Sequence, residues 1–273
     1  MVRERIDYTA AAVDAAKSVL IELTHILGEY RDDIVLVGGW IPELLIPQSQ
    51  ERHVGSIDVG LALNHKELTE AGYRMIGETL RRHGYVQDGQ QPFIFHRTVR
   101  GQIVQVDFLA GEYGGTGRSR RTQRVLDIQP RKARGCDLAF QIASATVIVK
   151  GQLPNGAADE VRIQIASVVP FLVMKGMALE DRRKAKDAYD IYFVLHNYPG
   201  GVDGVVQAFM PHLKLALVKE GLKKIAGKFA TLDHVGPRDV AEFDDTLDEE
   251  ERAIRQRDAF ERVNSFLQQL NIV

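Results

Sequence analysis

The chain of 273 residues is 45% hydrophobic and 26% charged, and 35 Lys and Arg against 37 Asp and Glu give a net charge of -2. This balance is typical of one large globular domain or two smaller ones. It excludes a uniformly basic nucleic-acid coat protein and an acidic disordered tail protein. A single cysteine, Cys136, excludes a disulfide framework and any zinc or iron–sulfur site built from several cysteines.

The amino-terminal segment and the apolar stretches indicate where the protein resides. Charged residues interrupt the first 26 positions, which is not the pattern of a signal peptide. The longest apolar stretch, residues 168–174, is far shorter than the ~20 residues that span a bilayer. We therefore expect a cytoplasmic protein that does not enter a membrane.

Hydrophobic periodicity predicts alternating helices and strands up to about residue 166. The expected helices are 9–30, 40–45 and 65–83, and the expected strands are 33–39, 56–63, 92–99, 102–109, 146–150 and 161–166. The strands 92–99 and 102–109 flank Arg100-Gly101, a composition typical of a hairpin turn. Residues 110–135 are rich in Gly and Arg and are expected to form a loop.

Helical patterns dominate from residue 168 to the end of the chain. The expected helices are 168–180, 183–197, 203–225 and 249–270. We therefore predict an α/β (α+β) protein with a mixed α/β domain over residues 1–166. A helical domain over residues 167–273 is expected to complete a cleft with it.

Gly38 and Gly39 stand at the end of the first expected strand, directly before a helix. Glycines at such a turn let backbone amides approach a phosphate, and a helix N-terminus adds partial positive charge. A tight strand–helix turn without any ligand accounts for the same two residues. This feature alone leaves both interpretations open.

Two carboxylates interrupt strands that are otherwise apolar, Asp58 in the strand 56–63 and Asp107 in the strand 102–109. A carboxylate in such a position is costly unless it is paired or bound to a metal ion. Each Asp alone is also explained by a bond to a nearby turn. On neighbouring strands, however, the two would hold a hard cation such as Mg²⁺, and together they favour the functional interpretation.

This order of elements resembles the nucleotidyltransferase (polymerase-β-like) superfamily. The signature of that superfamily is Gly-Gly or Gly-Ser, then Asp-x-Asp on one strand, and a third carboxylate on a neighbouring strand. Gly38-Gly39, Asp58 and Asp107 occupy these places. The resemblance implies a nucleotidyltransferase-like mixed sheet with flanking helices, followed by a C-terminal helical domain.

Gly60 departs from the pattern, because the family has the second carboxylate of Asp-x-Asp at this position. The loss removes a formal charge and weakens binding of the ions that clamp the attacking and leaving oxygens. Three explanations stay open: a neighbour such as Glu43 substitutes, one ion suffices, or the chain has lost efficient catalysis.

Residues 170–192 resemble the hallmark of the AbiEii-like nucleotidyltransferases, which include toxins of toxin–antitoxin and phage-defence systems. The pattern is a Lys on one helix, an Arg up to two turns later, and Lys/Arg-Asp-x-Tyr-Asp on the next helix. Lys175, Arg182 and the stretch from Lys186 to Asp190 match it. Independently of the resemblance, Lys175 interrupts an apolar run and therefore needs an anionic partner.

The residues themselves leave alternatives open for the two acidic positions of this motif. Asp187 and Asp190 lie three apart, on one face of a helix that is otherwise mostly apolar. On a solvated face they would pair with Arg183, Lys184 or Lys186. For Asp190, deeper in the apolar stretch, a polar contact with the core and a catalytic role fit the sequence equally well.

The resemblance implies transfer of a nucleotide from an NTP to a hydroxyl of RNA (tRNA-like) or protein, with Mg²⁺ or Mn²⁺ and with pyrophosphate leaving. It also implies an antitoxin partner. The implied site residues are Asp58 and Asp107 for the metal, Asp58, Lys175 and Asp187 for catalysis, and Gly38, Gly39, Trp40, Lys175 and Arg182 for the nucleotide, with Glu43 and Asp190 as secondary candidates. The alternative is a catalytically impaired relative that binds nucleotide or a partner protein.

The near-zero net charge conceals two oppositely charged stretches. Residues 118–134 are basic, and they suit either a triphosphate or RNA backbone or a merely solvated loop. Residues 242–251 are acidic and are expected to be a solvated loop and a helix start. Four histidines lack metal-ligand spacing and are expected at the surface or in strands: His53, His65, His83 and His96.

Overall fold

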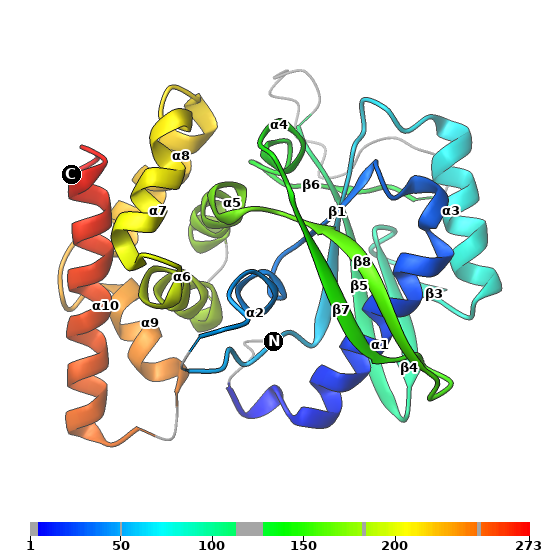
Figure 1. Ribbon diagram of the computed structural model, residues 1–273, viewed down its shortest axis with the longest axis horizontal. Helices are drawn as coiled ribbons and strands as arrows, with labels where there is room; N and C mark the ends of the chain where they lie inside the picture. Colours follow the sequence, from blue (N-terminus) through cyan, green and yellow to red (C-terminus); the bar gives the residue numbers. More distant parts are fainter. Residues whose placement is uncertain (1–4, 50, 113–127, 182–183, 245–246) are drawn as a thin grey trace. The chain divides into compact units, whose positions relative to one another are not determined.

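The computed structural model describes residues 5–49, 51–112, 128–181, 184–244 and 247–273 (Figure 1). The expected mixed α/β fold is confirmed. Within these ranges the chain forms a mixed eight-stranded sheet with flanking helices and a helical carboxyl-terminal part. No helix in the described part of the chain is long and apolar enough to cross a membrane.

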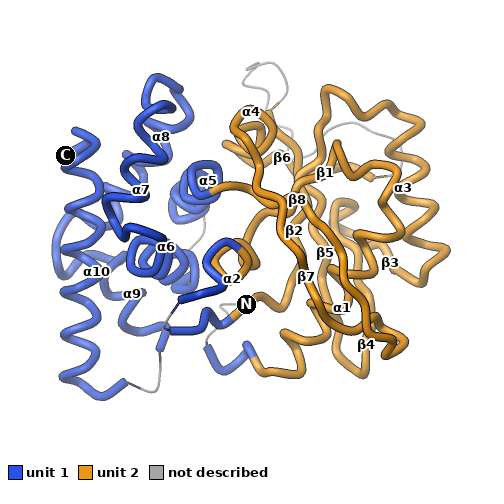
Figure 2. Tube along the Cα trace, in the orientation of Figure 1, with its two compact units in different colours: residues 1–8, 45–54, 168–273 blue, residues 9–44, 55–167 orange. Residues whose placement is uncertain are grey.

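The chain divides into two compact units, which Figure 2 distinguishes by colour. Unit 2 contains residues 9–44 and 55–167 and holds the sheet. Unit 1 contains residues 1–8, 45–54 and 168–273. The first two of these segments precede residue 166, so the chain leaves and re-enters the sheet unit in a way that a single boundary does not describe.

The sheet of unit 2 has the strand order β3-β4-β5-β2-β1-β8-β7, with β6 paired to β5. The β2–β5, β1–β8 and β5–β6 pairs are parallel, and the remaining pairs are antiparallel. The elements are α1 (Ala10–Ile26), β1 (Ile34–Val37), α2 (Ile41–Leu45), β2 (Asp58–Leu63), α3 (Glu70–Arg82), β3 (Val86–Gln87), β4 (Ile94–Val99), β5 (Gln102–Ala110), β6 (Arg131–Lys132), α4 (Leu138–Gln141), β7 (Ala145–Gln152) and β8 (Ala158–Ile165). Every expected strand is present, whereas β3, β6 and α4 are too short to show periodicity.

The expected hairpin between β4 and β5 is confirmed, and its turn explains why the strands pair tightly. Val99 pairs with Gln102, and the two residues between them, Arg100 and Gly101, have φ angles of 49° and 80°. Positive φ at both central residues matches the right-handed twist of the strands. The register of this hairpin fixes where the side chains of β5 point.

Helix α1 packs across β5, β7 and β8 on one face of the sheet (Figure 1). Thr9 caps its start by accepting a hydrogen bond from the backbone N–H of Ala12. Near its middle, the Glu22 carboxylate accepts hydrogen bonds from the Tyr85 hydroxyl (2.6 Å) and from Arg97 (3.0 and 3.1 Å). These bonds fix the rotation of α1 on one face of the sheet. The opposite face of the sheet is therefore not covered by this helix.

Unit 1 consists mainly of helices. They are α5 (Val168–Asp181), α6 (Ala185–Asn197), α7 (Gly201–Phe209), α8 (Ala216–Lys228), α9 (Val235–Phe243) and α10 (Glu249–Gln269). The prediction of one helix over 203–225 is wrong, because the chain turns through a 3-10 segment at Met210–His212. Pro211 has no N–H to donate and disfavours a continuing α-helix.

The acidic stretch before and within α10 is only partly solvated. Asp244 is buried and forms an ion pair with Arg5 of the same unit. Asp248 caps α10 by accepting from the backbone N–H of Glu251, whose side chain accepts in return from the backbone N–H of Asp248. Residues 245–246 lie outside the described part of the chain.

Helices α5 and α8 approach each other closely at two glycines. A Cβ atom on Gly176 would lie 2.4 Å from the Gly221 carbonyl oxygen, and one on Gly221 would lie 2.8 Å from Val173. Both distances are too short for a real Cβ atom, so a larger residue at either position would push the two helices apart. The two helices therefore depend on glycine at their contact.

We predict that Gly176→Ala destabilises unit 1. Overpacking against the α8 backbone costs about 1–3 kcal/mol, more than the ~1 kcal/mol that alanine gains over glycine in a helix. Urea unfolding followed by circular dichroism measures the difference. Gly227→Ala is the matched control, because nothing lies within 4 Å of its added Cβ and the variant should be as stable as wild type or more so. Equal gains in both variants would contradict the close packing.

Candidate functional site

Asp58 and Asp107 lie on one face of the sheet, on neighbouring strands as expected. In the parallel β2–β5 pair, Asp58 is opposite Gln105, and Gly60 is opposite Asp107. Side chains two apart on a strand share a face, so all four positions point to the same side. We call these four residues the carboxylate face. The Cα atoms of Asp58 and Asp107 are diagonal neighbours, about 8 Å apart by ordinary sheet dimensions.

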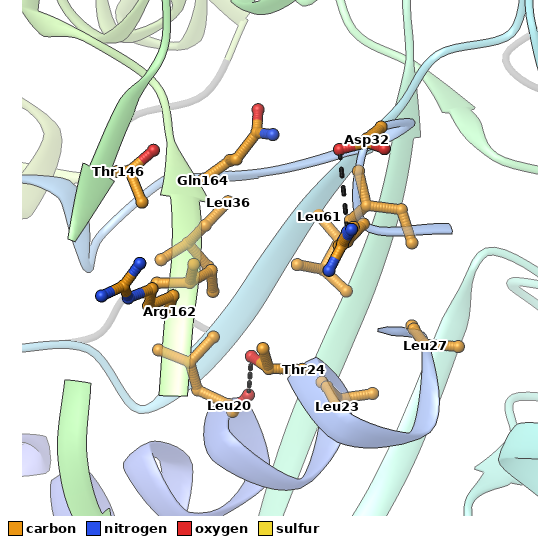
Figure 3. Close-up of a pocket in the computed structure, with 13 residues that line it drawn as sticks. Leu20, Leu23, Thr24, Leu27, Asp32, Leu36, Leu61, Thr146, Arg162 and Gln164 are labelled. Carbon is orange, nitrogen blue, oxygen red and sulfur yellow. Dashed lines mark hydrogen bonds and ion pairs between the residues drawn. The ribbon is translucent and has the colours of Figure 1, made fainter. Parts of the chain in front are cut away.

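The other face of the sheet carries a pocket of about 270 Å³ beneath α1 (Figure 3). Leu36 and Leu61 are register partners that line it together with Leu23 of α1 and Leu27, which directly follows that helix. Because Leu61 follows Gly60 directly, the pocket and the carboxylate face are on opposite sides of β2. The pocket is therefore separate from the predicted site residues.

The Gly38-Gly39 turn lies beside the start of β2, next to Asp58. Gly38 has a φ of 87°, which favours glycine, and nothing lies within 4 Å of where its Cβ would be. Trp40 is fully buried, and its indole N–H donates to the backbone carbonyl of Asp58 (2.9 Å). The following helix, α2, has only five residues. The open space is thus at Gly38, while Trp40 holds the turn against β2.

Both carboxylates of this face already accept hydrogen bonds. The Ser56 hydroxyl donates to Oδ1 of Asp58 (2.6 Å). The Gln105 side-chain amide donates to both Oδ1 and Oδ2 of Asp107, each at 3.0 Å. Ser56 is buried, whereas both carboxylates and Gln105 are half-buried. The two acidic side chains are therefore held in place and are partly exposed.

The donor set suits at most one cation with two protein ligands. Within the described residues, no group of three or more His, Cys, Asp or Glu side chains is arranged to hold a metal ion. Mg²⁺ is commonly bound by one or two carboxylates, with phosphate oxygens and water completing its shell. Asp58 and Asp107 fit that mode. Glu43 does not complete a third ligand; its carboxylate lies 3.1 Å from the Cβ position of Gly55.

The motif residues of unit 1 form a buried charge cluster of Lys175, Lys186, Asp187 and Asp190. Lys175 Nζ lies 2.6 Å from Asp187 Oδ1 and 2.6 Å from Asp190 Oδ2. Lys186 Nζ lies 2.8 Å from Asp190 Oδ1. All four residues are buried, and the two positive and two negative charges balance. Each charge therefore has an opposite partner, as burial requires.

His53 attaches the segment 45–54 to this cluster. Its Nε2 donates to Asp190 Oδ1 (2.9 Å), and its ring stacks on Tyr189, with centroids 5.6 Å apart. Burial and the positive charge of Lys186 lower the pKa of His53 to about 4, although the bond to Asp190 opposes this shift. Burial alone would raise the pKa of Asp190, but Lys175 and Lys186 hold it well below its usual range.

These contacts exclude the solvated-face alternative for both Asp187 and Asp190. Asp190 makes a core polar contact rather than a solvated pair, since it is completely buried among Lys175, Lys186 and His53. The expectation that His53 lies at the surface or in a strand is wrong. Its partner is 137 residues away in sequence, so no local pattern indicates the contact. Gln105 was also missed, although its place two residues before Asp107 puts both on one face.

The candidates fall into two groups. Gly38, Gly39, Trp40, Glu43, Asp58 and Asp107 belong to unit 2, and Lys175, Asp187 and Asp190 belong to unit 1. Arg182 lies outside the described residues, as do residues 118–127 of the basic stretch. Comparison of the chain with protein-family models, curated proteins and solved structures finds no match.

We predict that Lys175→Met strongly destabilises unit 1, because it leaves two buried carboxylates short of positive charge. The expected loss in the free energy of unfolding is about 3–5 kcal/mol, measured by urea titration. Lys214→Met, an exposed lysine of the same unit, is the control and should change stability by less than about 0.5 kcal/mol. If both variants were equally stable, the buried ion pairs would not exist as described.

The pH dependence of stability tests His53. An unfolded histidine protonates near pH 6.5, whereas the buried ring resists protonation down to about pH 4. Stability from this group is therefore complete above pH 6.5 and is lost as the pH falls, by about 2 kcal/mol at pH 5. His53→Gln should remove that part of the pH dependence, and His212→Gln should retain it. Parallel profiles for wild type and His53→Gln would show that the ring is not buried in this way.

Proposed function

We propose that this protein binds a nucleoside triphosphate at the carboxylate face and transfers its nucleotide to a hydroxyl group. The observation that supports this most is the register of β2 and β5. It puts Asp58 and Asp107 on one face, and the Gly38-Gly39 turn lies at the start of β2. The same three features carry the resemblance to nucleotidyltransferases. The pairing of β2 with β5 is an observation separate from the sequence motif on which that resemblance rests.

In the proposed reaction the acceptor hydroxyl oxygen bonds to the α-phosphorus, and the bond from that phosphorus to pyrophosphate breaks. A bound Mg²⁺ or Mn²⁺ supplies positive charge that offsets the charge of the phosphates. Asp58 and Asp107 would be its protein ligands. The open space at Gly38 would let a phosphate approach the backbone N–H groups of the turn.

The roles of Lys175 and Asp187 in this proposal come from the resemblance alone. It assigns Lys175 to the triphosphate and gives Asp187 the proton of the acceptor hydroxyl. The contacts within unit 1 account for both residues as partners in a buried ion pair. A loss of activity in their variants therefore has meaning only after stability has been measured.

Nucleotide binding without transfer is the second candidate function, and Gly60 favours it. This glycine is opposite Asp107, at the position where a third carboxylate would stand. With two carboxylates, the site has less negative charge for ions that stabilise the transferred phosphoryl group. An RNA or protein acceptor belongs to the first candidate only, whereas a partner protein is compatible with both.

The test is incubation of the purified protein with Mg²⁺ and each of the four α-labelled NTPs, with and without total RNA. We expect label on RNA or on protein, with a loss of about 100-fold or more in Asp58→Asn and Asp107→Asn. Glu160→Gln, an exposed carboxylate on β8, should retain full activity.

The outcomes separate the two candidate functions. Label in either acceptor supports the transferase and identifies the acceptor class. Equilibrium binding of an NTP, lost in Asp107→Asn but without any labelled product, supports the second candidate. If no NTP binds, neither candidate function stands.

A further inference from the structure

We infer that the pocket under α1 is a binding site for a small monocarboxylate with an apolar chain, and that Arg162 recognises the carboxylate (Figure 3). The pocket lies entirely within unit 2, on the side of β2 that faces away from the carboxylate face. The inference therefore goes beyond the proposed function and does not depend on it.

The pocket occupies an opening between the strands β1 and β8. These parallel strands pair at a single position, where Leu36 is opposite Ile165. A continued register would place Ile34 opposite Ile163, but both of these residues line the pocket instead. Residues 162–164 of β8 all border the pocket, and side chains alternate between faces along a strand. The edge of β8, rather than one of its faces, therefore forms this wall.

Leucines form the interior of the pocket. Leu20 and Leu23 of α1 and Leu36 and Leu61 of the sheet are buried and line it. The volume of about 270 Å³ exceeds the ~150 Å³ of a cavity that binds benzene and is below the ~300–1,000 Å³ of pockets for drug-sized ligands. This size fits a short hydrocarbon chain rather than a peptide strand. A chain against these leucines would remove apolar surface of both partners from water.

The polar residues at the rim favour an anionic ligand. Figure 3 shows Arg162 and Asp32 on opposite sides of the pocket. Asp32 is opposite Arg31, with 3.9 Å between Oδ1 and Nε. Arg162 is exposed, and within the described part of the chain no carboxylate pairs with it. Two residues further along β8, Gln164 accepts from the Ser144 hydroxyl through Oε1 (3.0 Å), and its amide N–H groups are donors. A carboxylate at the β8 end would meet both kinds of donor.

The experiment is calorimetric titration of the full-length protein with octanoate, below the concentration at which octanoate forms micelles. We expect one site per chain. Octanol has the same chain without the charge, and it should bind about tenfold more weakly because it lacks the charge-assisted contact. Hexanoate should bind about 15-fold more weakly, because each buried methylene contributes about a factor of four.

Two pairs of variants locate the site. Arg162→Gln should weaken octanoate binding about tenfold. Arg74→Gln, at an exposed arginine of α3 in the same unit, is its matched control and should bind as wild type does. Thr24 lines the pocket, and its hydroxyl donates to the Leu20 carbonyl of its own helix (2.9 Å). Thr24→Phe should fill the pocket and abolish binding, whereas Thr24→Val, which is similar in shape, should retain it.

Methyl NMR of the wild type locates the ligand without any variant. The signals of Leu36 and Leu61 should shift when octanoate is added, and those of Leu222, in the core of unit 1, should not. Circular dichroism checks that each variant is folded, and the NMR result decides if Thr24→Phe is not.

The inference is overturned if octanoate does not bind, or if it binds without shifting the Leu36 and Leu61 signals. Equal binding of octanoate by Arg162→Gln and wild type, or equal affinity for octanol and octanoate, would also overturn it, since the carboxylate would then not be recognised. These measurements contain no nucleotide, so they are independent of the proposed function. That function fails separately, if no NTP binds.

Discussion

The parallel pairing of β2 with β5 is the constraint on which the candidate site depends. Its register places Gly60 opposite Asp107 and Gln105 opposite Asp58, and the two-residue period of a strand then puts all four on one face. A shift of one residue in this pairing would turn the carboxylate of the displaced strand toward α1 and into the apolar side of the sheet, away from the other carboxylate. The β4–β5 hairpin, closed by Arg100 and Gly101, stabilises this register from the other edge of β5.

A second constraint acts in unit 1, where charges are buried rather than exposed. Lys175, Lys186, Asp187 and Asp190 form a balanced set, and removal of any one would leave an uncompensated charge in a medium of low dielectric constant. His53 contributes a neutral ring to the same set and ties the segment 45–54 to α6. A motif that the resemblance treats as catalytic therefore also organises this unit.

Apolar alternation, a local pattern, predicted the strands of the sheet. The adjacency of Asp58 and Asp107 was implied only by the family resemblance, because no local pattern pairs β2 with β5. The sequence did not predict the division of the helix at Met210–His212, although Pro211 was a usable signal. The contact of His53 with Asp190 could not be predicted, since it joins positions 137 apart. The engagement of Asp107 by Gln105 depends on side-chain conformation, which periodicity does not specify.

The carboxylate face and the pocket under α1 are on opposite sides of β2. The position of a bound nucleotide therefore shows whether it uses the carboxylates or binds elsewhere. The most direct measurement is a crystal structure of the protein with a non-hydrolysable NTP and Mn²⁺, located by its anomalous scattering. We expect one Mn²⁺ in contact with Asp58, Asp107 and the phosphates. A nucleotide bound elsewhere, or a Mn²⁺ ion that contacts neither carboxylate, would contradict this expectation.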